Sequence, residues 1–317
     1  MKNAARLLVV AAVLSLSSAA QAAPHGILWA KGKGPTRTAA ASNLLYYGGP
    51  IIPNAKIYAV FWGSNVPQET QQGIGPFLGN MADSGYMDWL SEYDTNGKAV
   101  DGRDGTHQHI GRGTFNGAFV ITPNNKSASL SDADIQAELE AQIAAGKLPP
   151  SDANSLYMTY FPDGVSIEIA GQKSCQQFCA YHEGFNSKSG APVYYGVMPV
   201  CGGFGCGFGD AFGNLTIVSS HEAIEAITDP FPTPGSSPAF PQAWNTTDGQ
   251  EIGDLCAGTS GTVTGHGLTS KVQGEWDNAS SACLTGPWNQ APALMSKAPA
   301  TPPMALGWKT SWTVPAW

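Results

Sequence analysis

Short apolar runs that alternate with helical segments constrain the fold of this chain more than any other feature. Four runs have the β-branched and aromatic composition of strands, namely 55–62, 117–122, 155–161 and 193–199. Three helical patterns lie between or after these runs, namely 67–83, 131–145 and 215–228. Alternation of this kind predicts an α/β protein in which helices pack on a mixed sheet.

The first residues have the features of a secretory signal peptide. Lys2 and Arg6 precede an apolar run over 7–16, and Ala20 and Ala22 are the small residues of a cleavage site. The run is too short to cross a membrane, and no second run follows. We therefore predict cleavage after Ala22 and a secreted protein, extracellular or periplasmic, without a transmembrane segment.

The charge of the mature chain restricts its partners. Removal of residues 1–22 takes away two of the 16 basic side chains and none of the 24 acidic ones, which leaves a formal charge near −10. Such a charge disfavours binding to nucleic acid and to an anionic membrane surface.

The six cysteines fit export into an oxidising compartment. An even number in a secreted chain predicts three disulfides, which staple the fold, although six cysteines allow fifteen pairings. Proximity in sequence favours the pairs Cys175–Cys179, Cys201–Cys206 and Cys256–Cys283. The alternative is a zinc site built from Cys175, Cys179 and His182, which an oxidising compartment disfavours.

The composition predicts one main domain with two peripheral segments. Residues 43–286 hold all the predicted strands and helices without an internal linker, and the 38 glycines of the chain indicate a loop-rich fold. Residues 23–42 are polar and glycine-rich, which predicts a flexible segment. Residues 287–317 are rich in proline and tryptophan, which predicts an extended segment over the body.

The segment 219–230 carries the most specific chemical signal. His221 and Glu225 are four residues apart, so a helix places them on one face, one turn apart. Glu222 follows His221, where the general base lies in the His-Glu-x-x-His helix of zinc metallopeptidases. Because a carboxylate also binds zinc, we predict that His221 and Glu225 are metal ligands and that Glu222 is the catalytic base.

A second acidic segment lies further along the chain. Glu251 and Asp254 are three residues apart and lie just before Cys256. Either carboxylate could be the third metal ligand, and the other would then orient the ligating histidine. Without His221 and Glu225, the same segment would be interpreted as an acidic surface turn. Because the candidate ligands are mostly carboxylates, Ca²⁺ is the alternative to Zn²⁺.

Three further residues are weaker candidates. His182 could act at the site as a catalytic group that stabilises an oxyanion, or as a ligand. Asp229 follows the motif helix and precedes a proline, so it is also an ordinary helix stop. His266 lies between two glycines, which would let the backbone approach a ligand. His107 and His109 are expected to be exposed.

Five blocks of sequence occur in an order that resembles the phosphate-induced protein (Exordium-like) family. They are 46–52 with 57–63, 178–182, 201–206, 221–230 and 251–256. The short signal peptide and Asp229, where plant members tend to have asparagine, are similar to bacterial-type members. The resemblance implies an extracellular or cell-wall protein, in a family without a settled activity.

Two functions follow from these observations. The first is a secreted metal-dependent hydrolase, and the sequence favours a zinc metallopeptidase that acts on a peptide or protein. The order of sheet and His-Glu helix then suggests a zincin-like domain by analogy. The second is a non-catalytic extracellular protein that binds cell-wall polysaccharide or a partner, with a structural calcium site. Nine tryptophans would suit stacking on sugars, although large aromatic residues usually belong to the core.

Overall fold

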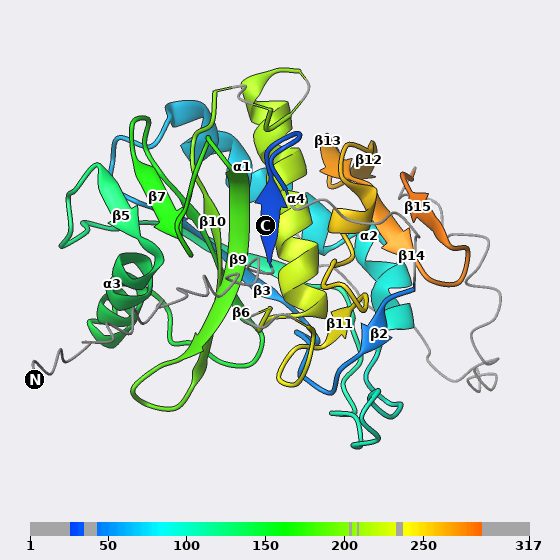
Figure 1. The fold of residues 1–317 in the computed structure, drawn as a ribbon. Helices are drawn as coiled ribbons and strands as arrows, with labels where there is room; N and C mark the ends of the chain where they lie inside the picture. The colour runs from blue at the N-terminus through cyan, green and yellow to red at the C-terminus, as the bar shows by residue number, and fades with distance from the viewer. Residues whose placement is uncertain (1–25, 35–42, 203–204, 208, 233–236, 287–317) are drawn as a thin grey trace, which may run out of the picture.

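A computed structural model describes residues 26–34, 43–202, 205–207, 209–232 and 237–286 (Figure 1). The predicted signal peptide and the predicted extended segment 287–317 lie outside the described residues. Within the described part of the chain, no helix is both long and apolar enough to cross a membrane.

A six-stranded mixed sheet forms the centre of the fold, in the order β1-β9-β10-β6-β3-β4. Four neighbouring strands are parallel, and β9 and then β1 continue the sheet in antiparallel pairing at one edge. Its strands are β1 (Ile27–Trp29), β3 (Lys56–Phe61), β4 (Thr114–Val120), β6 (Ser155–Tyr160), β9 (Phe178–Asn186) and β10 (Pro192–Met198). The mixed α/β class predicted from the alternation is therefore confirmed.

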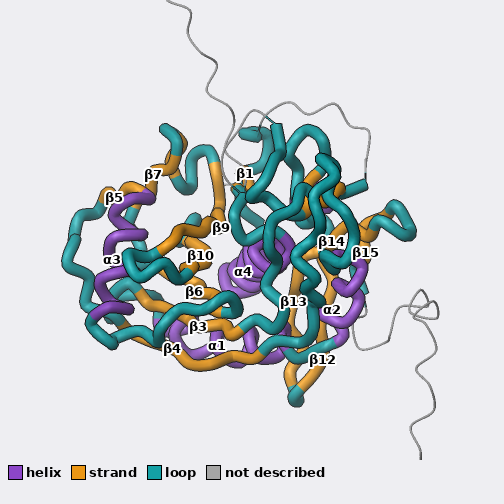
Figure 2. The backbone as a smooth tube through the Cα atoms, turned by 90° about the horizontal axis from the view of Figure 1, so that it is seen from below, coloured by secondary structure: helices purple, strands orange, loops and turns teal. Residues whose placement is uncertain are grey.

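Helices cover both faces of this sheet (Figure 2). The residues of β3 alternate between two apolar clusters, so Ile57 and Phe61 pack on one face while Tyr58 and Val60 pack on the other. The first cluster includes residues of α1 (Gln68–Ala82) and α4 (Ala211–Thr228), and the second includes residues of α3 (Asp132–Ala144). The main sheet is consequently the middle layer of three.

Local sequence explains where these helices begin. Ser131 caps α3 by accepting a hydrogen bond from the Asp134 amide, and Asp134 completes a capping box. Asp210 caps α4 by accepting from the Gly213 amide, so the helix begins at Ala211, four residues earlier than the start expected at 215. Pro67 immediately precedes α1, where the missing N–H of proline costs nothing.

Smaller elements complete the body. Short helical turns follow α1, namely α2 (Gly85–Asp88) and η1 (Trp89–Tyr93), and η2 (Asp254–Cys256) lies in the second acidic segment. Small sheets are formed by β2 (Leu45–Tyr46) with β11 (Trp244–Asn245), β12 (Ser260–Gly265) with β13 (Leu268–Gln273), β14 (Glu275–Asp277) with β15 (Ala282–Leu284), and β5 (Ser129–Ser131) with β7 (Ser166–Ile169) and β8 (Gln172–Lys173).

The structure corrects the expectation for the segment 23–42. Ile27 and Leu28 are buried and belong to β1, which pairs with β9 at the edge of the main sheet. The apolar run of this strand is only three residues long and is flanked by glycines, so the sequence did not predict a strand here. Residues 23–25 and 35–42 lie outside the described residues.

Three disulfides are present, but two of the predicted pairings are wrong. The structure joins Cys175 to Cys201 and Cys179 to Cys206, while the predicted pair Cys256–Cys283 is confirmed. Cys175 lies in the turn before β9 and Cys179 lies within β9, and each is bonded to a cysteine of the segment after β10. The segment after β10 lies alongside this part of β9 and brings both partners within reach. The zinc site of Cys175, Cys179 and His182 is excluded, because both cysteines are bonded elsewhere. Three disulfides fit an extracellular protein.

Peptide mapping without reduction will test this connectivity. Chymotrypsin cleaves after Phe178 and Phe204, which separates each cysteine of the two neighbouring pairs onto its own peptide. We expect mass spectra to show Cys175 linked to Cys201 and Cys179 linked to Cys206. A peptide pair that links Cys175 to Cys179 would contradict the structure, and Cys256–Cys283 serves as the internal control.

Candidate metal centre

The candidate site lies on α4, against the sheet face that this helix covers (Figure 1). His221, Glu222 and Glu225 are all fully buried. The helical spacing places His221 and Glu225 one turn apart, and their Nε2 and Oε2 atoms are 3.0 Å apart. Ionisable side chains are rarely buried unless they are paired or bind a metal, so this helix face needs a chemical explanation.

Strand β9 brings a second imidazole to the same place. His182 is fully buried, and its Nδ1 lies 3.3 Å from Glu222 Oε2 and 3.7 Å from Glu225 Oε2. Its Nε2 lies 3.4 Å from Glu251 Oε1 and 3.1 Å from the backbone oxygen of Asp229. The structure therefore places His182 between the acidic residues of α4 and those that follow the helix.

The second acidic segment is buried against α4 rather than forming a surface turn. Glu251 is fully buried and accepts a hydrogen bond of 2.7 Å from the Gly26 amide. The amides of Gly253 and Asp254 both donate to Glu225 Oε1. A Cβ at Gly253 would lie 2.5 Å from His221 Nδ1, so this close approach requires glycine.

Several buried polar atoms at the centre have no hydrogen-bond partner among the described residues. They are His221 Nε2, Glu222 Oε1, Glu225 Oε2 and Glu251 Oε1. Buried polar atoms are nearly always hydrogen-bonded, and leaving one unpaired costs about 1–3 kcal/mol. Such atoms within one buried cluster could be satisfied by a bound cation.

Two overlapping sets of side chains could hold such an ion. One set is His221, Glu225 and Asp254, and the other is His182, Glu225 and Glu251; within each set the donor atoms all lie within 4.8 Å of one another. The separations of 3.0–3.7 Å from the imidazoles to Glu225 and Glu251 are close to the ~3.4 Å between ligands of a tetrahedral ion with bonds of about 2.1 Å. The donor atoms thus fit a small cation, and Glu225 belongs to both sets.

The charges of the cluster depend on one another. Burial opposes protonation of His221, but the Glu225 carboxylate outweighs it and raises the pKa of His221 to about 10. Burial raises the pKa of Glu222 to about 7, against the opposing effect of the His182 hydrogen bond. Burial also raises the pKa of Glu251, against the attraction of His182. Protons therefore balance the buried carboxylates in this arrangement, and a cation that bound here would displace them.

Neighbouring residues that the sequence analysis missed orient these groups. Gln273 Nε2 lies 2.8 Å from His221 Nδ1 and donates to the Gly253 oxygen at 2.8 Å. Glu275 is fully buried and accepts a hydrogen bond of 2.7 Å from the Tyr86 hydroxyl. Neither Gln273 nor Glu275 belongs to a motif, and their distance of about fifty residues from His221 gave no signal in the sequence.

The weaker candidates separate into two groups. Asp229 is fully buried beside the site, where its carboxylate accepts hydrogen bonds from the Ala243 amide and the Asn245 side chain. His266 is exposed and contacts Asp83, away from the buried cluster. His107 and His109 are exposed, as predicted.

Comparison of the chain with protein-family models, with curated proteins and with solved structures gives no match. The geometry of the site therefore carries the functional argument that follows.

Proposed function

We propose that this protein is an exported metal-dependent hydrolase that cleaves peptide bonds. The observation that carries the proposal is the fully buried cluster of two imidazoles and several carboxylates, in which four polar atoms make no hydrogen bond to a described residue. The helix with metal donors packed on a mixed sheet also suits a zincin-like arrangement, which we propose together with membership of the Exordium-like family.

We propose that the ion is Zn²⁺, held by His221, Glu225 and Asp254. Both candidate sets include an imidazole nitrogen, which zinc accepts readily, whereas Ca²⁺ takes six to eight oxygen ligands. His221 Nε2 and Glu225 Oε2 form a buried ion pair of 3.0 Å and have no other hydrogen-bond partner among the described residues, which favours this set. Gln273 Nε2 lies 2.8 Å from Nδ1 of the same ring and donates to the Gly253 oxygen, which fixes the orientation of the imidazole.

The residues beside this set provide acid–base chemistry. Glu222 directs one oxygen to His182 and has a second that is unpartnered, so the carboxylate can accept a proton from a water molecule and later return it to a leaving amine. His182 positions Glu222 and can stabilise the negative charge that develops on the substrate oxygen. A bound zinc ion would supply Lewis acidity to such a reaction. Glu251, held by the Gly26 amide, contacts His182 from the other side.

The alternative of a polysaccharide-binding protein lacks an observation in its favour. None of the five tryptophans that the structure describes is fully exposed. The rings of Trp62, Trp89 and Trp276 belong to the apolar clusters of the body.

Chelation will test the proposed activity. The mature protein should cleave members of a mixed peptide library, lose this activity in a strong chelator and regain it when one equivalent of Zn²⁺ is added. Mass spectrometry of the products measures the cleavage. An activity that survives removal of all bound metal would overturn the proposed mechanism, and the absence of cleavage over a broad range of peptides and pH would overturn the proposed function.

A further inference from the structure

A cavity of about 240 Å³ lies directly beside the candidate metal centre. Its lining includes Gln273, whose side chain contacts His221. The position of Gln273 is fixed, because its backbone amide donates to Ser220 and its backbone oxygen accepts from Tyr86.

The walls of this cavity are largely apolar. They include Leu28 from β1, Ile217 and Val218 from α4, and the Cys179–Cys206 disulfide. Ligand pockets typically combine such walls with a few well-placed polar groups. Here the polar lining consists of Lys31, Thr259, Ser260 and Gln273, and the Gln273 amide contacts His221. The volume suits one aliphatic or aromatic side chain.

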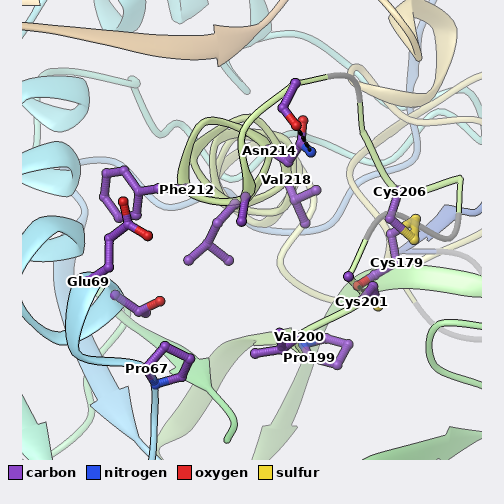
Figure 3. Close-up of a pocket in the computed structure, with 15 residues that line it drawn as sticks. Pro67, Glu69, Cys179, Pro199, Val200, Cys201, Cys206, Phe212, Asn214 and Val218 are labelled. Carbon is purple, nitrogen blue, oxygen red and sulfur yellow. Dashed lines mark hydrogen bonds between the residues drawn. A yellow bond between two sulfur atoms is a disulfide. The ribbon is translucent and has the colours of Figure 1, made fainter. Parts of the chain in front are cut away.

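A second cavity, of about 340 Å³, is lined by the same disulfide. Figure 3 shows it between Phe212 and Val218 of α4, the disulfide, and the segments at Pro67 and Pro199. Val218 and the disulfide line both cavities, whereas Gln273 lines only the smaller one. The larger cavity therefore has no described side chain that contacts His221, and it provides a control of similar character.

We propose that the 240 Å³ cavity is the specificity pocket of the enzyme and receives one bulky apolar side chain of a peptide substrate. This inference rests on the proposed hydrolase function and names its substrate class. Gln273 is a positioning residue in this account, since it links the occupied pocket to the orientation of His221. A preference for leucine or phenylalanine over alanine follows, because the larger side chains bury apolar surface that alanine leaves in water.

Two substitutions on α4 separate the cavities. Ile217 lines only the smaller cavity and Leu215 only the larger one, and both are half-buried on the same helix. Ile217→Trp should fill the specificity pocket, and Leu215→Trp adds similar bulk to the larger cavity. Ile217→Ala should enlarge the specificity pocket, which extends the preference to tryptophan, a gain that misfolding cannot produce.

The probes are end-blocked octapeptides of alanine and glycine that carry alanine, leucine, phenylalanine or tryptophan at one position. We expect the unmodified protein to cleave the leucine and phenylalanine peptides roughly 10- to 100-fold more efficiently than the alanine peptide, at one fixed position relative to the cleaved bond. Ile217→Trp should remove this preference, and Leu215→Trp should retain it. The inference would be overturned if the two tryptophan variants had the same preference among the peptides, or if the unmodified protein had none.

Binding in the presence of EDTA keeps this test separate from the test of catalysis. Displacement of a fluorescein-labelled phenylalanine peptide measures the affinity of each probe without turnover. Tighter binding of the leucine and phenylalanine peptides than of the alanine peptide supports the proposed pocket, provided that Ile217→Trp abolishes this difference and Leu215→Trp does not. This result would support the pocket even if none of the proteins cleaves a peptide. Equal affinity of the unmodified protein for all four probes would overturn the proposed pocket, whether or not the protein binds a metal.

Discussion

Glu222→Gln should abolish most of the peptidase activity while the protein keeps its fold and its zinc. Glutamine has nearly the same size as glutamate, and its side-chain oxygen can still face His182, but the amide cannot accept a proton from water. Positioned acid–base groups contribute about 10²–10⁴-fold to rate, so kcat should fall by roughly this factor. The measurement is kcat on one cleaved peptide, with bound zinc quantified in the same sample.

Glu183→Gln is the matched control for this variant. Glu183 follows His182 on β9, is almost fully buried, and accepts a hydrogen bond from the Gly184 amide. Because successive strand residues point to opposite faces, its side chain points away from the cluster. We expect Glu183→Gln to keep its activity. Undiminished cleavage by a zinc-loaded Glu222→Gln protein would exclude Glu222 as the base.

Glu225→Gln should lose zinc and activity together. Glu225 belongs to both candidate ligand sets, so its loss weakens binding in either arrangement. The amide oxygen can still accept from Gly253 and Asp254, but an NH₂ group replaces the Oε2 atom that faces His221. We expect zinc affinity to fall by roughly 100-fold or more, beyond the 10–100-fold typical of groups that only support a ligand.

Glu225→Ala provides a contrast in stability. It leaves one buried and one partly buried amide unpaired and removes the ion-pair partner of His221, which should lower the free energy of unfolding by about 3–5 kcal/mol. Urea denaturation of the metal-free proteins measures this difference. A Glu225→Gln protein that binds zinc as tightly as the unmodified chain would rule out the proposed ligand set.

The sequence predicted those parts of the fold that depend on local pattern. The strands β3, β6 and β10 and the helices α1, α3 and α4 were all expected close to their observed positions, because apolar periodicity and capping residues specify them. Strand β9 was missed, although His182 lies on it. Its polar residues and glycine interrupt the apolar pattern, and it is stabilised by pairing with β10 and β1 on either side.

The residues of the candidate site could likewise be predicted only where a local sequence pattern specifies them. The spacing of His221, Glu222 and Glu225 was readable because one helix carries all three. Gln273 and Glu275 reach the site from β13 and β14, which no local pattern connects to α4. The pairing of two disulfides was predicted wrongly for the same reason, because pairing depends on which segments lie side by side after folding.

The zinc content of the purified mature protein tests the central claim most directly. Elemental analysis after dialysis against metal-free buffer should give about one zinc per chain, and close to none for Glu225→Gln prepared in parallel. Stoichiometric calcium without zinc, or a chain that remains metal-free after incubation with Zn²⁺, would contradict the account.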